Sequence, residues 1–487
     1  MSLDIVKHSK AGVLSLVSGQ AARVLVQVIS IVVLARLLTP ADYGLTAIVV
    51  TLVGLGEIVR DFGLSSSAVQ ADSLNNREKS NLFWINSLIG TSLAALLFFS
   101  APLLAAWFQD ARLADIARVM SLAFLFNGLA TQYKAALTRD MKFSHLAISD
   151  SLAALLSMVV GIVAAYQGMQ YWAIVIQQIL LSFFTLVLYV MFHRWLPAWP
   201  DIHTSVRRFI TFGMHLMGSQ MLGQLSRSVD TLIIGQRFGA DLLGIYNRGQ
   251  QLVFMALNQI NAPSTTLAIP VLSKLKHDSK EYYRFLNYGQ SVLMHAVSLF
   301  FGLLVLNADL VINIMLGQQW LSAIPIVQIL AIAAIFQVAN YSSYWIFVSK
   351  GLTRDQLIFT LVSRPVMILI IILGAVWNIY TVAAAYALAL LFIWLYCYFF
   401  LSKRDIDVTA LLKNSVVVCI SYLLAVSLGM LSINLYDLGM IYAVIVRNLV
   451  FILALLITYK FSLTFSASAD CLLKLMTSNL KKLILRK

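Results

Sequence analysis

The sequence predicts an all-α polytopic membrane protein, and three observations lead to this fold class. Of its 487 residues, 60% are hydrophobic and only 11% are charged, whereas soluble domains contain about 25% charged residues. The hydrophobic residues form long continuous segments, unlike the short alternating segments of a membrane β-barrel. A helix satisfies its backbone hydrogen bonds internally, as a chain in hydrocarbon must. We therefore expect a bundle of membrane-spanning helices.

Fourteen segments are apolar and long enough to cross about 30 Å of hydrocarbon. In chain order they lie near residues 11–38, 42–70, 80–107, 113–138, 145–168, 170–193, 208–236, 242–272, 283–306, 321–348, 355–377, 380–401, 412–433 and 439–460. Several exceed the roughly 20 residues that a span needs, so those helices are expected to tilt or protrude. The first segment is too long for a secretory signal and is expected to be retained as a span.

The basic residues predict which side of the membrane each loop faces. With the N-terminus inside, twenty-five of the thirty-five Lys and Arg residues, Lys134 among them, fall in cytoplasmic segments. The opposite turns GMQ, WNIY and NLYDLGM carry no Lys or Arg. Both termini are therefore expected in the cytoplasm.

Composition and loop length argue against several classes of function. The net charge of +14 lies mainly in the loops, so we expect no nucleic-acid partner. The three cysteines, Cys397, Cys419 and Cys471, lack metal-ligand spacing and predict neither a metal site nor a disulfide framework. The short loops leave no room for a catalytic domain. We therefore expect no metal, no cofactor and no enzymatic activity, and we place function within the bundle.

The polar segment HRWLPAWPDIHTSVRR follows the sixth span and contains two prolines. It predicts a linker between two six-span lobes. We expect a first lobe at 1–194, a cytoplasmic linker at 195–207, a second lobe at 208–402, two further spans at 403–465 and a basic amphipathic tail at 466–487. The tail is expected to lie on the inner leaflet of the membrane.

The two lobes are expected to be copies of one repeat. A shift of 200 residues aligns Gly44 with Gly244 and Gly63 with Pro263, and it preserves span lengths and turn positions over two helices. Because six spans are an even number, both lobes would have the same topology, related by a pseudo-twofold axis along the membrane normal. The predicted fold is two pseudo-symmetric six-helix lobes around a central cavity, plus two C-terminal helices. Rocking of the lobes would provide alternating access.

Charged residues at membrane depth are the candidate functional residues, because a charge at a helix centre costs roughly 2.5 kcal/mol or more. The basic ones are all arginines: Arg23, Arg60, Arg118, Arg227, Arg248, Arg364 and Arg447. The acidic ones are Glu57, Asp61, Asp150 and Asp230. The surplus of arginine predicts an anionic cargo, since guanidinium groups suit bidentate binding of phosphate or carboxylate.

Counting residues along the chain predicts that some of these charged side chains lie at the same membrane depth and form pairs. Arg23 and Glu57 lie seventeen residues on either side of Pro40, so they share a depth and an Arg23–Glu57 contact is expected. Asp230 and Arg248 are expected to meet in the same way. Such pairs are either structural links between helices or parts of a binding site, and the sequence leaves both interpretations open.

The 200-residue shift helps to separate charges of the fold from charges of a site. Glu57 and Arg60 correspond to Leu257 and Ile260, so the repeat is built without these charges. The candidate anion-binding residues are Arg23, Arg60, Arg227, Arg248 and Arg364. The candidate ion-coupling or switch residues are Glu57, Asp61 and Asp230. A carboxylate that alternates between a protonated and an arginine-paired state can link an ion gradient to lobe rocking.

Uncharged polar residues are also dense in the helices expected to face the cavity, among them Gln177 and Gln178. Two interpretations stay open for these amides. They bond neighbouring helices, which is the commoner role of such residues, or they meet hydroxyl groups of a sugar.

The stretch ARLLTPADYGLTAI followed by RDFGLSSSAVQ resembles the opening of bacterial Wzx-like polysaccharide flippases. These belong to the multidrug/oligosaccharidyl-lipid/polysaccharide exporter superfamily, and the branch of colanic-acid-type exopolysaccharides is the most similar. The resemblance implies a flippase that moves an undecaprenyl-diphosphate-linked oligosaccharide across the bacterial inner membrane, coupled to an ion gradient. It also implies membrane lipids, a polymerase and a chain-length regulator as partners of a functional monomer. Arg60 is then expected to bind the diphosphate, and Asp61 to bind the coupling ion.

Three alternatives are weighed. A drug/cation antiporter of the same superfamily typically offers an acid in its first helix, whereas residues 11–38 contain only Arg23 and Arg36 as charges. A lipid II flippase fits the arginines equally well, and only the motif resemblance argues against it. A polysaccharide polymerase usually has a large periplasmic loop, which this chain lacks.

Overall fold

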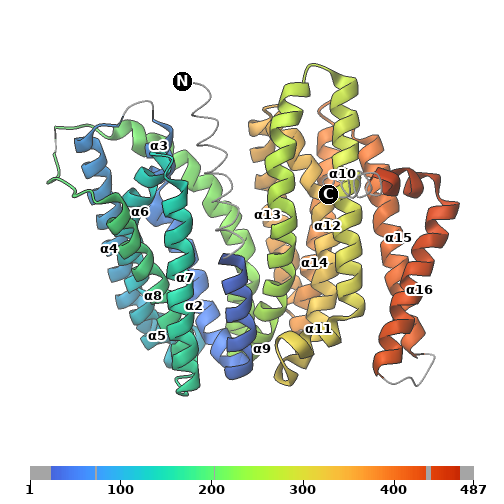
Figure 1. Ribbon diagram of the computed structural model, residues 1–487, viewed down its shortest axis with the longest axis horizontal. Helices are drawn as coiled ribbons and strands as arrows, with labels where there is room; N and C mark the ends of the chain where they lie inside the picture. Colours follow the sequence, from blue (N-terminus) through green and yellow to red (C-terminus); the bar gives the residue numbers. More distant parts are fainter. Residues whose placement is uncertain (1–22, 72–73, 202, 435–439, 472–487) are drawn as a thin grey trace, which may run out of the picture. The chain divides into compact units, whose positions relative to one another are not determined.

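The structure is a computed structural model that describes residues 23–71, 74–201, 203–434 and 440–471. Within these ranges the chain is almost entirely helical and contains no strand (Figure 1). Ten of the helices described there are long and apolar enough to cross a membrane. The predicted all-α, multi-pass membrane fold is thereby confirmed, while the total of fourteen spans stays a prediction.

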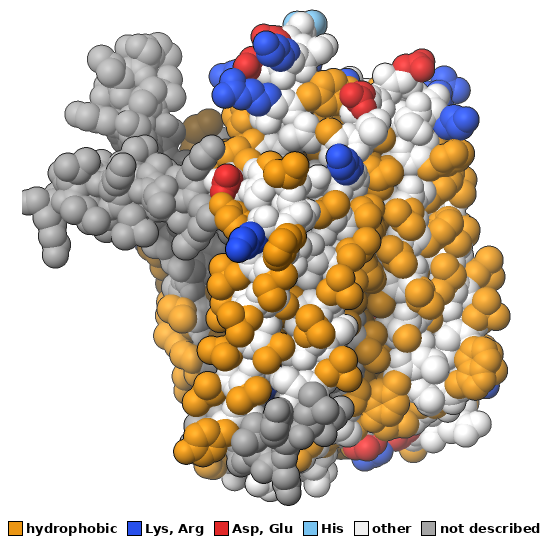
Figure 2. All heavy atoms as spheres, turned by 90° about the vertical axis from the view of Figure 1, so that its right-hand side faces the viewer, with side chains coloured by type: hydrophobic (Ala, Val, Ile, Leu, Met, Phe, Trp, Pro, Cys, Tyr) orange, Lys and Arg blue, Asp and Glu red, His pale blue; other side chains and the backbone are white. Residues whose placement is uncertain are grey.

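The surface agrees with a membrane location. Figure 2 shows a broad band of hydrophobic side chains over the face that it draws, with charged side chains gathered toward its two ends. Phe99 and Trp107 are more than two thirds exposed. An apolar surface of this extent is costly in water and is favourable in hydrocarbon.

The chain forms two compact units, Met1–Asn247 and Arg248–Lys487. The first unit contains a helix at residues 23–37 and the helices α2 (Pro40–Asp61), α3 (Leu64–Gln70), α4 (Asn76–Phe108), α5 (Arg112–Met120), α6 (Leu122–Arg139), α7 (Phe143–Tyr166), α8 (Tyr171–His193) and the first part of α9 (Arg207–Leu275). Within this unit α4 packs on α6, α6 packs on α8, and α8 packs on α7.

The second unit contains the rest of α9 and a similar series of helices. These are α10 (Ser279–Leu306), α11 (Ala308–Met315), the 3₁₀ helix η1 (Gln318–Ala323), α12 (Ile324–Ser349), α13 (Thr353–Gly374), α14 (Ile379–Ser402), α15 (Thr409–Asn434) and α16 (Met440–Phe461). Here α10 packs on α12, α12 packs on α14, and α14 packs on α13. This order matches that of α4, α6, α8 and α7, which supports the predicted repeat. The predicted domain boundaries stay a prediction, and the predicted tail is described only to Cys471.

The TPADYG motif at residues 39–44 builds the start of α2. Thr39 is the N-cap: its hydroxyl accepts from the Asp42 N–H, and the Asp42 carboxylate accepts from the Thr39 N–H at 2.9 Å. Pro40 occupies the first turn, where its missing N–H costs nothing. Asp42 also accepts from the N–H of Tyr171 at 3.0 Å, which ties the start of α8 to α2. The motif that carries the family resemblance therefore positions helices.

The glycine of this motif takes part in a reciprocal helix crossing within the first unit. A Cβ at Gly44 would overlap the carbonyl group of Ala240, and a Cβ at Gly244 would overlap the carbonyl group of Pro40. Residues 40 and 44 thus contact residues 240 and 244 in exchanged order. A local two-fold axis that relates each residue to the one 200 positions later requires this reciprocity, so the contact supports the 200-residue shift.

The predicted span at 42–70 is divided into two helices. Phe62 and Gly63 both have positive φ angles, 49° and 65°, and the N–H of Phe62 caps α2 by donating to the Ile58 carbonyl. The division falls directly after Asp61, so the charged turn of this segment is the last turn of α2.

The predicted spans 208–236 and 242–272 are two helices joined at a kink, and together they carry the label α9. Its helical path is interrupted at Gly239, where φ is 82° and ψ is 177°. The interruption falls between the two predicted spans, the first of which ends at residue 236 and the second of which begins at residue 242.

The predicted linker is fastened to α4. Asn81 donates to the carbonyl groups of Asp201 and Thr204 at 2.8 and 3.0 Å. The indole rings of Trp84 and Trp199 stack with 6.0 Å between their centroids. The linker is therefore held against the first turns of α4 within the first unit.

Candidate functional site

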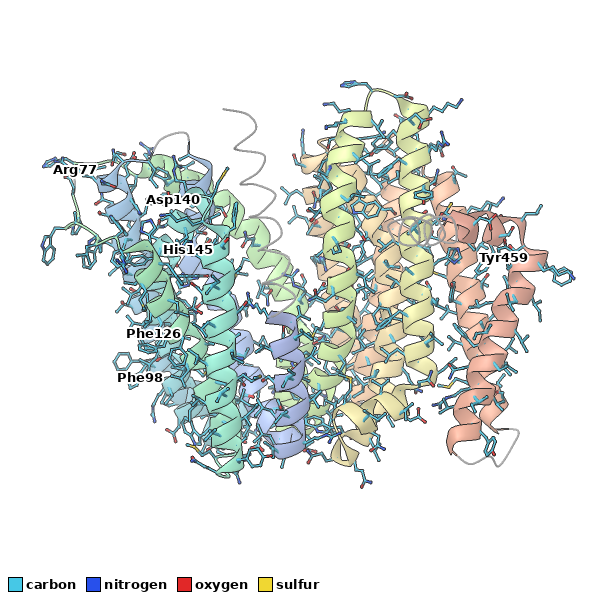
Figure 3. All side chains as sticks on the ribbon, viewed as in Figure 1. Arg77, Phe98, Phe126, Asp140, His145 and Tyr459 are labelled. Atoms are coloured by element: carbon cyan, nitrogen blue, oxygen red, sulfur yellow. The ribbon has the colours of Figure 1, made fainter. Side chains whose placement is uncertain are left out.

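A cavity of about 770 Å³ lies within the first unit, a size typical of small-molecule sites. It is lined by the helix at 23–37 and by α2, α3, α5, α6, α7 and α8. Along α6 the lining runs from Ala123 to Thr138, which corresponds to about 22 Å of helix rise. The cavity thus extends toward the end of α6, where Figure 3 labels Asp140. Its charged lining residues are Arg23, Glu57, Arg60, Asp61, Lys134 and Asp150.

An ion pair on α2 forms one wall of the cavity. Nε of Arg60 donates to Oε2 of Glu57, three residues earlier on the same helix, at 2.6 Å. Nη1 of Arg60 also donates to the Asn127 carbonyl at 2.9 Å and to the Thr131 hydroxyl. Nδ2 of Asn127 donates to the other oxygen of the Glu57 carboxylate at 2.9 Å. Both members of the pair are therefore held against α6.

The backbone of this turn is also braced. Nδ2 of Asn86, on α4, donates to the Arg60 carbonyl at 3.0 Å. Nε2 of Gln132, on α6, donates in turn to Oδ1 of Asn86 at 2.8 Å. Asn86 and Gln132 are both buried. Two helices, α4 and α6, thus fix the end of α2 on which Arg60 lies.

A second charged group faces the same cavity from α7 and α8. Nη1 of Arg23 lies 3.5 Å from Oδ2 of Asp150, and the Tyr189 hydroxyl donates to Oδ1 of Asp150 at 2.6 Å. The Arg23 side chain is 48% exposed. The predicted Arg23–Glu57 contact is replaced by two separate pairs, because Glu57 finds Arg60 on its own helix and α7 brings Asp150 to Arg23.

Two charged lining residues are unpaired. Within the described part of the chain, neither the Asp61 carboxylate nor the Lys134 ammonium makes an ion pair or a hydrogen bond. Lys134 was expected in a cytoplasmic segment at the end of the span 113–138, and the structure places it on α6 in the cavity wall. A sequence signal exists: Asn127, Thr131, Lys134 and Thr138 are spaced by four, three and four residues, which places them on one helix face.

The charges of this cavity balance. Three cationic side chains, those of Arg23, Arg60 and Lys134, face three anionic ones, those of Glu57, Asp61 and Asp150. The surplus of positive charge expected from the sequence is therefore absent from this cavity. Binding of an anion here depends on which cationic donors lack a partner, and not on net charge.

Two other predicted site residues of the first unit do not line this cavity. Arg227 is exposed and donates to Oε1 of Gln224, one turn earlier, at 3.0 Å. Asp230 is fully buried and accepts from the Tyr246 hydroxyl at 2.9 Å. Asp230 therefore sits in a packed environment, with no direct access to a ligand in this cavity.

Arg248 and Arg364 belong to the second unit. Nη1 of Arg364 lies 3.7 Å from Sδ of Met367, one turn along α13. The predicted contact between Asp230 and Arg248 would join the two units, and it stays a prediction.

Two of the arginines at membrane depth form ion pairs outside the cavity. Arg118 pairs with Asp115, three residues earlier on α5, at 3.0 Å, and both side chains are well exposed. Arg447 holds Asp309 with two hydrogen bonds of 2.9 and 3.1 Å, and its side chain is 5% exposed. The Arg447–Asp309 pair links α16 to α11, whereas the Arg118–Asp115 pair lies on the exposed surface of α5.

Solved structures of two helical membrane transporters share this fold. The lipid II flippase MurJ in an inward closed conformation superposes with a TM-score of 0.72 at 15% identity, over 92% of this chain and 99% of MurJ. An inward-facing multidrug resistance MATE family transporter superposes with a TM-score of 0.62 at 15% identity, over 80% of this chain and 96% of that one. At this level of identity the likeness shows a shared fold.

The sequence gives the family. Residues 33–325 match the model of the polysaccharide biosynthesis protein family, which is more than half of the chain, so the protein belongs to this family. It is 28% identical over 330 residues to the teichuronic acid biosynthesis protein TuaB of Bacillus subtilis (strain 168), covering 67% of this chain and 68% of TuaB. It is 23% identical over 320 residues to the lipopolysaccharide biosynthesis protein WzxC of Escherichia coli (strain K12), covering 63% of each. The resemblance to Wzx-like proteins is thereby confirmed at the level of the family.

Proposed function

We propose that this protein flips an undecaprenyl-diphosphate-linked oligosaccharide from the cytoplasmic to the periplasmic leaflet, for exopolysaccharide or O-antigen synthesis. The family and the names of its relatives support a role in polysaccharide biosynthesis. The observation that carries the proposal is the charged cavity of the first unit, which offers both fixed and unpaired cationic groups. The protein acts as a transporter and performs no bond-forming chemistry on the glycan.

The wall formed by α2 and α6 is the part of the cavity suited to a diphosphate. Arg60 presents a guanidinium held in one orientation, and within the described residues its Nη2 has no hydrogen-bond partner. Lys134, three residues beyond Thr131 and hence about 5 Å further along α6, adds a mobile ammonium group. The fixed guanidinium group of Arg60 and the flexible ammonium group of Lys134 can together bind two linked phosphates.

Asp61 is the carboxylate best placed to couple transport to an ion gradient. It lines the cavity one residue after Arg60 and has no partner within the described residues, so it is open to a proton or a cation. Glu57 is already bound by Arg60 and Asn127 and acts in this proposal as the holder of Arg60.

The location and partners follow from the same proposal. The protein lies in the inner membrane of a bacterium with both termini in the cytoplasm, which the distribution of Lys and Arg supports. It works as a monomer and delivers its cargo to a polymerase and a chain-length regulator of the same pathway.

The proposal is tested by complementation of a deletion strain. Arg60→Ala should abolish polysaccharide export at wild-type protein level, because it removes the fixed guanidinium. Arg118→Ala, which alters an exposed pair outside the cavity, is the matched control and should export normally. Normal export by Arg60→Ala would show that this cavity is not the path of the cargo.

The fold shared with MurJ defines the second candidate, a lipid II flippase. The same deletion strain separates the two functions. Loss of the polysaccharide with normal growth supports the proposal, whereas lysis from failed cell-wall synthesis supports lipid II as the cargo.

A further inference from the structure

A row of polar side chains lines the cavity from α8. Gln178, Ser182, Thr185 and Tyr189 are spaced by four, three and four residues and all belong to the cavity lining, so they lie on one face of the helix. The spacing equals that of Asn127, Thr131, Lys134 and Thr138 on α6. The cavity therefore has two polar rows, one on each of two helices that pack together.

The two rows differ in how their polar groups are used. On α6, the Thr131 hydroxyl donates to the Asn127 carbonyl at 2.7 Å and accepts from Arg60. On α8, the side chains of Gln178 and Thr185 make no hydrogen bond with any described residue. The Ser182 hydroxyl makes a single long bond of 3.4 Å to the Gln178 carbonyl. The α8 row thus keeps donors and acceptors available to a ligand.

The neighbouring amide Gln177 shows what a structural role looks like on the same helix. Its Nε2 donates to the Ser30 hydroxyl at 2.9 Å, which joins α8 to the helix at 23–37. Gln177 does not line the cavity, whereas Gln178 does. The sequence left two interpretations open for these adjacent amides. Bonding between helices applies to Gln177, and contact with a ligand is open to Gln178.

We propose that Gln178, Ser182 and Thr185 bind sugar hydroxyls of the cargo and determine which glycan is carried. The inference rests on the proposed function. Amide and hydroxyl side chains both donate and accept hydrogen bonds, as sugar hydroxyls do. From Gln178 to Thr185 the row covers about 10 Å of helix rise along the cavity wall. A site built of such groups rejects a glycan that leaves them unpaired.

The test uses the full-length protein in lipid nanodiscs and two probes. One probe is the oligosaccharide repeat released from the polysaccharide of the source organism, and the other is farnesyl diphosphate, which carries no sugar. The Gln178→Leu/Thr185→Val double variant should bind the oligosaccharide roughly 10-fold more weakly, as loss of one or two hydrogen bonds predicts. It should bind farnesyl diphosphate as the wild type does, which also shows that it is folded. The control Gln177→Leu should bind both probes normally.

The two probes separate failure of this inference from failure of the proposed function. Wild-type affinity of the double variant for the oligosaccharide would overturn the inference. Binding of farnesyl diphosphate without any binding of the oligosaccharide by the wild type would also overturn it, while the flippase proposal would stand. Binding of the oligosaccharide through the α8 row without binding of farnesyl diphosphate would support the inference and contradict the diphosphate cargo.

Discussion

The two units of this protein join their helices with different chemistry. In the second unit, Gln290, Ser342, Tyr398 and Asn414 form a hydrogen-bonded network that connects α10, α12, α14 and α15. All four are uncharged and none is more than 8% exposed. In the first unit, the corresponding inter-helix network contains the Glu57–Arg60 ion pair, and it faces a cavity.

This contrast separates polar groups that hold helices together from polar groups that contact a ligand. Neutral amides and hydroxyls, fully enclosed, satisfy one another and act as links between spans. Charges within a membrane span are retained where they face a cavity or a partner. Leu257, which the 200-residue shift aligns with Glu57, is fully buried. The second unit therefore builds the same kind of bundle without the charged pair.

The largest effect is expected on polysaccharide export, when Glu57 and Arg60 of the first unit are replaced by the residue types at the equivalent positions of the second unit. Glu57→Leu combined with Arg60→Ile reproduces the pattern of Leu257 and Ile260. The double variant should fold, because replacing an ion pair by apolar residues is often neutral or stabilising, but it should lose polysaccharide export. Thermal unfolding in detergent and export in the deletion strain measure the two properties.

The single variant Arg60→Ile is the control for this replacement. It leaves the Glu57 carboxylate without its ion-pair partner and should lower the free energy of unfolding by about 1 to 3 kcal/mol relative to the double variant, since the pair is partly exposed. Normal export by the double variant would show that the charged pair is not needed for transport, and the functional distinction between the two units would then fail.

A smaller effect is expected where residues 200 positions apart meet. Gly44→Ala and Gly244→Ala should each lower the free energy of unfolding by about 1 to 3 kcal/mol, because either methyl group would enter a backbone carbonyl of the crossing helix. Equal losses would support the local two-fold axis. Gly218→Ala, where a Cβ meets no atom within 4 Å, is the control and should stabilise α9 by up to about 1 kcal/mol. A large loss at only one of the two crossing glycines would argue against the reciprocal contact.

The neutral network should affect stability and not transport. Gln290→Leu removes hydrogen bonds to Tyr398 and Ser342 and should lower the free energy of unfolding by about 1 to 2 kcal/mol, the size expected for a few inter-helix bonds in a membrane protein. Export per folded molecule should stay at the wild-type level. Loss of export without loss of stability would show that the second unit also binds cargo.

The smallest effect is expected on the local stability of the linker in the first unit. The Thr204 hydroxyl and the His203 N–H hold the pKa of Asp201 below its usual range. A lowered pKa stabilises the linker above the unfolded pKa of about 3.9, and this stabilisation is lost as the pH falls through the folded value. The protection of the residue 203–206 amides against hydrogen exchange, relative to the intrinsic exchange rate at each pH, should therefore decrease in acid in the wild type. In Asp201→Asn this protection should be nearly independent of pH, and an unchanged loss of protection in acid would contradict this assignment.

The class of fold and much of the family could be predicted from the amino-acid sequence alone. Long apolar segments predict spanning helices whatever their neighbours are, because the backbone must satisfy itself in hydrocarbon. The position of Gly44 and Gly244 in the two repeats was also visible in the sequence, as was the charged turn that contains Glu57, Arg60 and Asp61. Depth can be counted along a helix at about 1.5 Å per residue, and this count placed Arg23 and Glu57 at one depth, where both line the same cavity.

The pairing of the charged and polar groups could be seen only once the helices were packed together. Counting depth paired Arg23 with Glu57, whereas packing gave Arg23 to Asp150 and left Glu57 to Arg60. Packing likewise turned Gln177 to a neighbouring helix and Gln178 to the cavity. The physical reason is that sequence spacing fixes height and relative angle on one helix, while the rotation of that helix against its neighbours is set by the whole bundle.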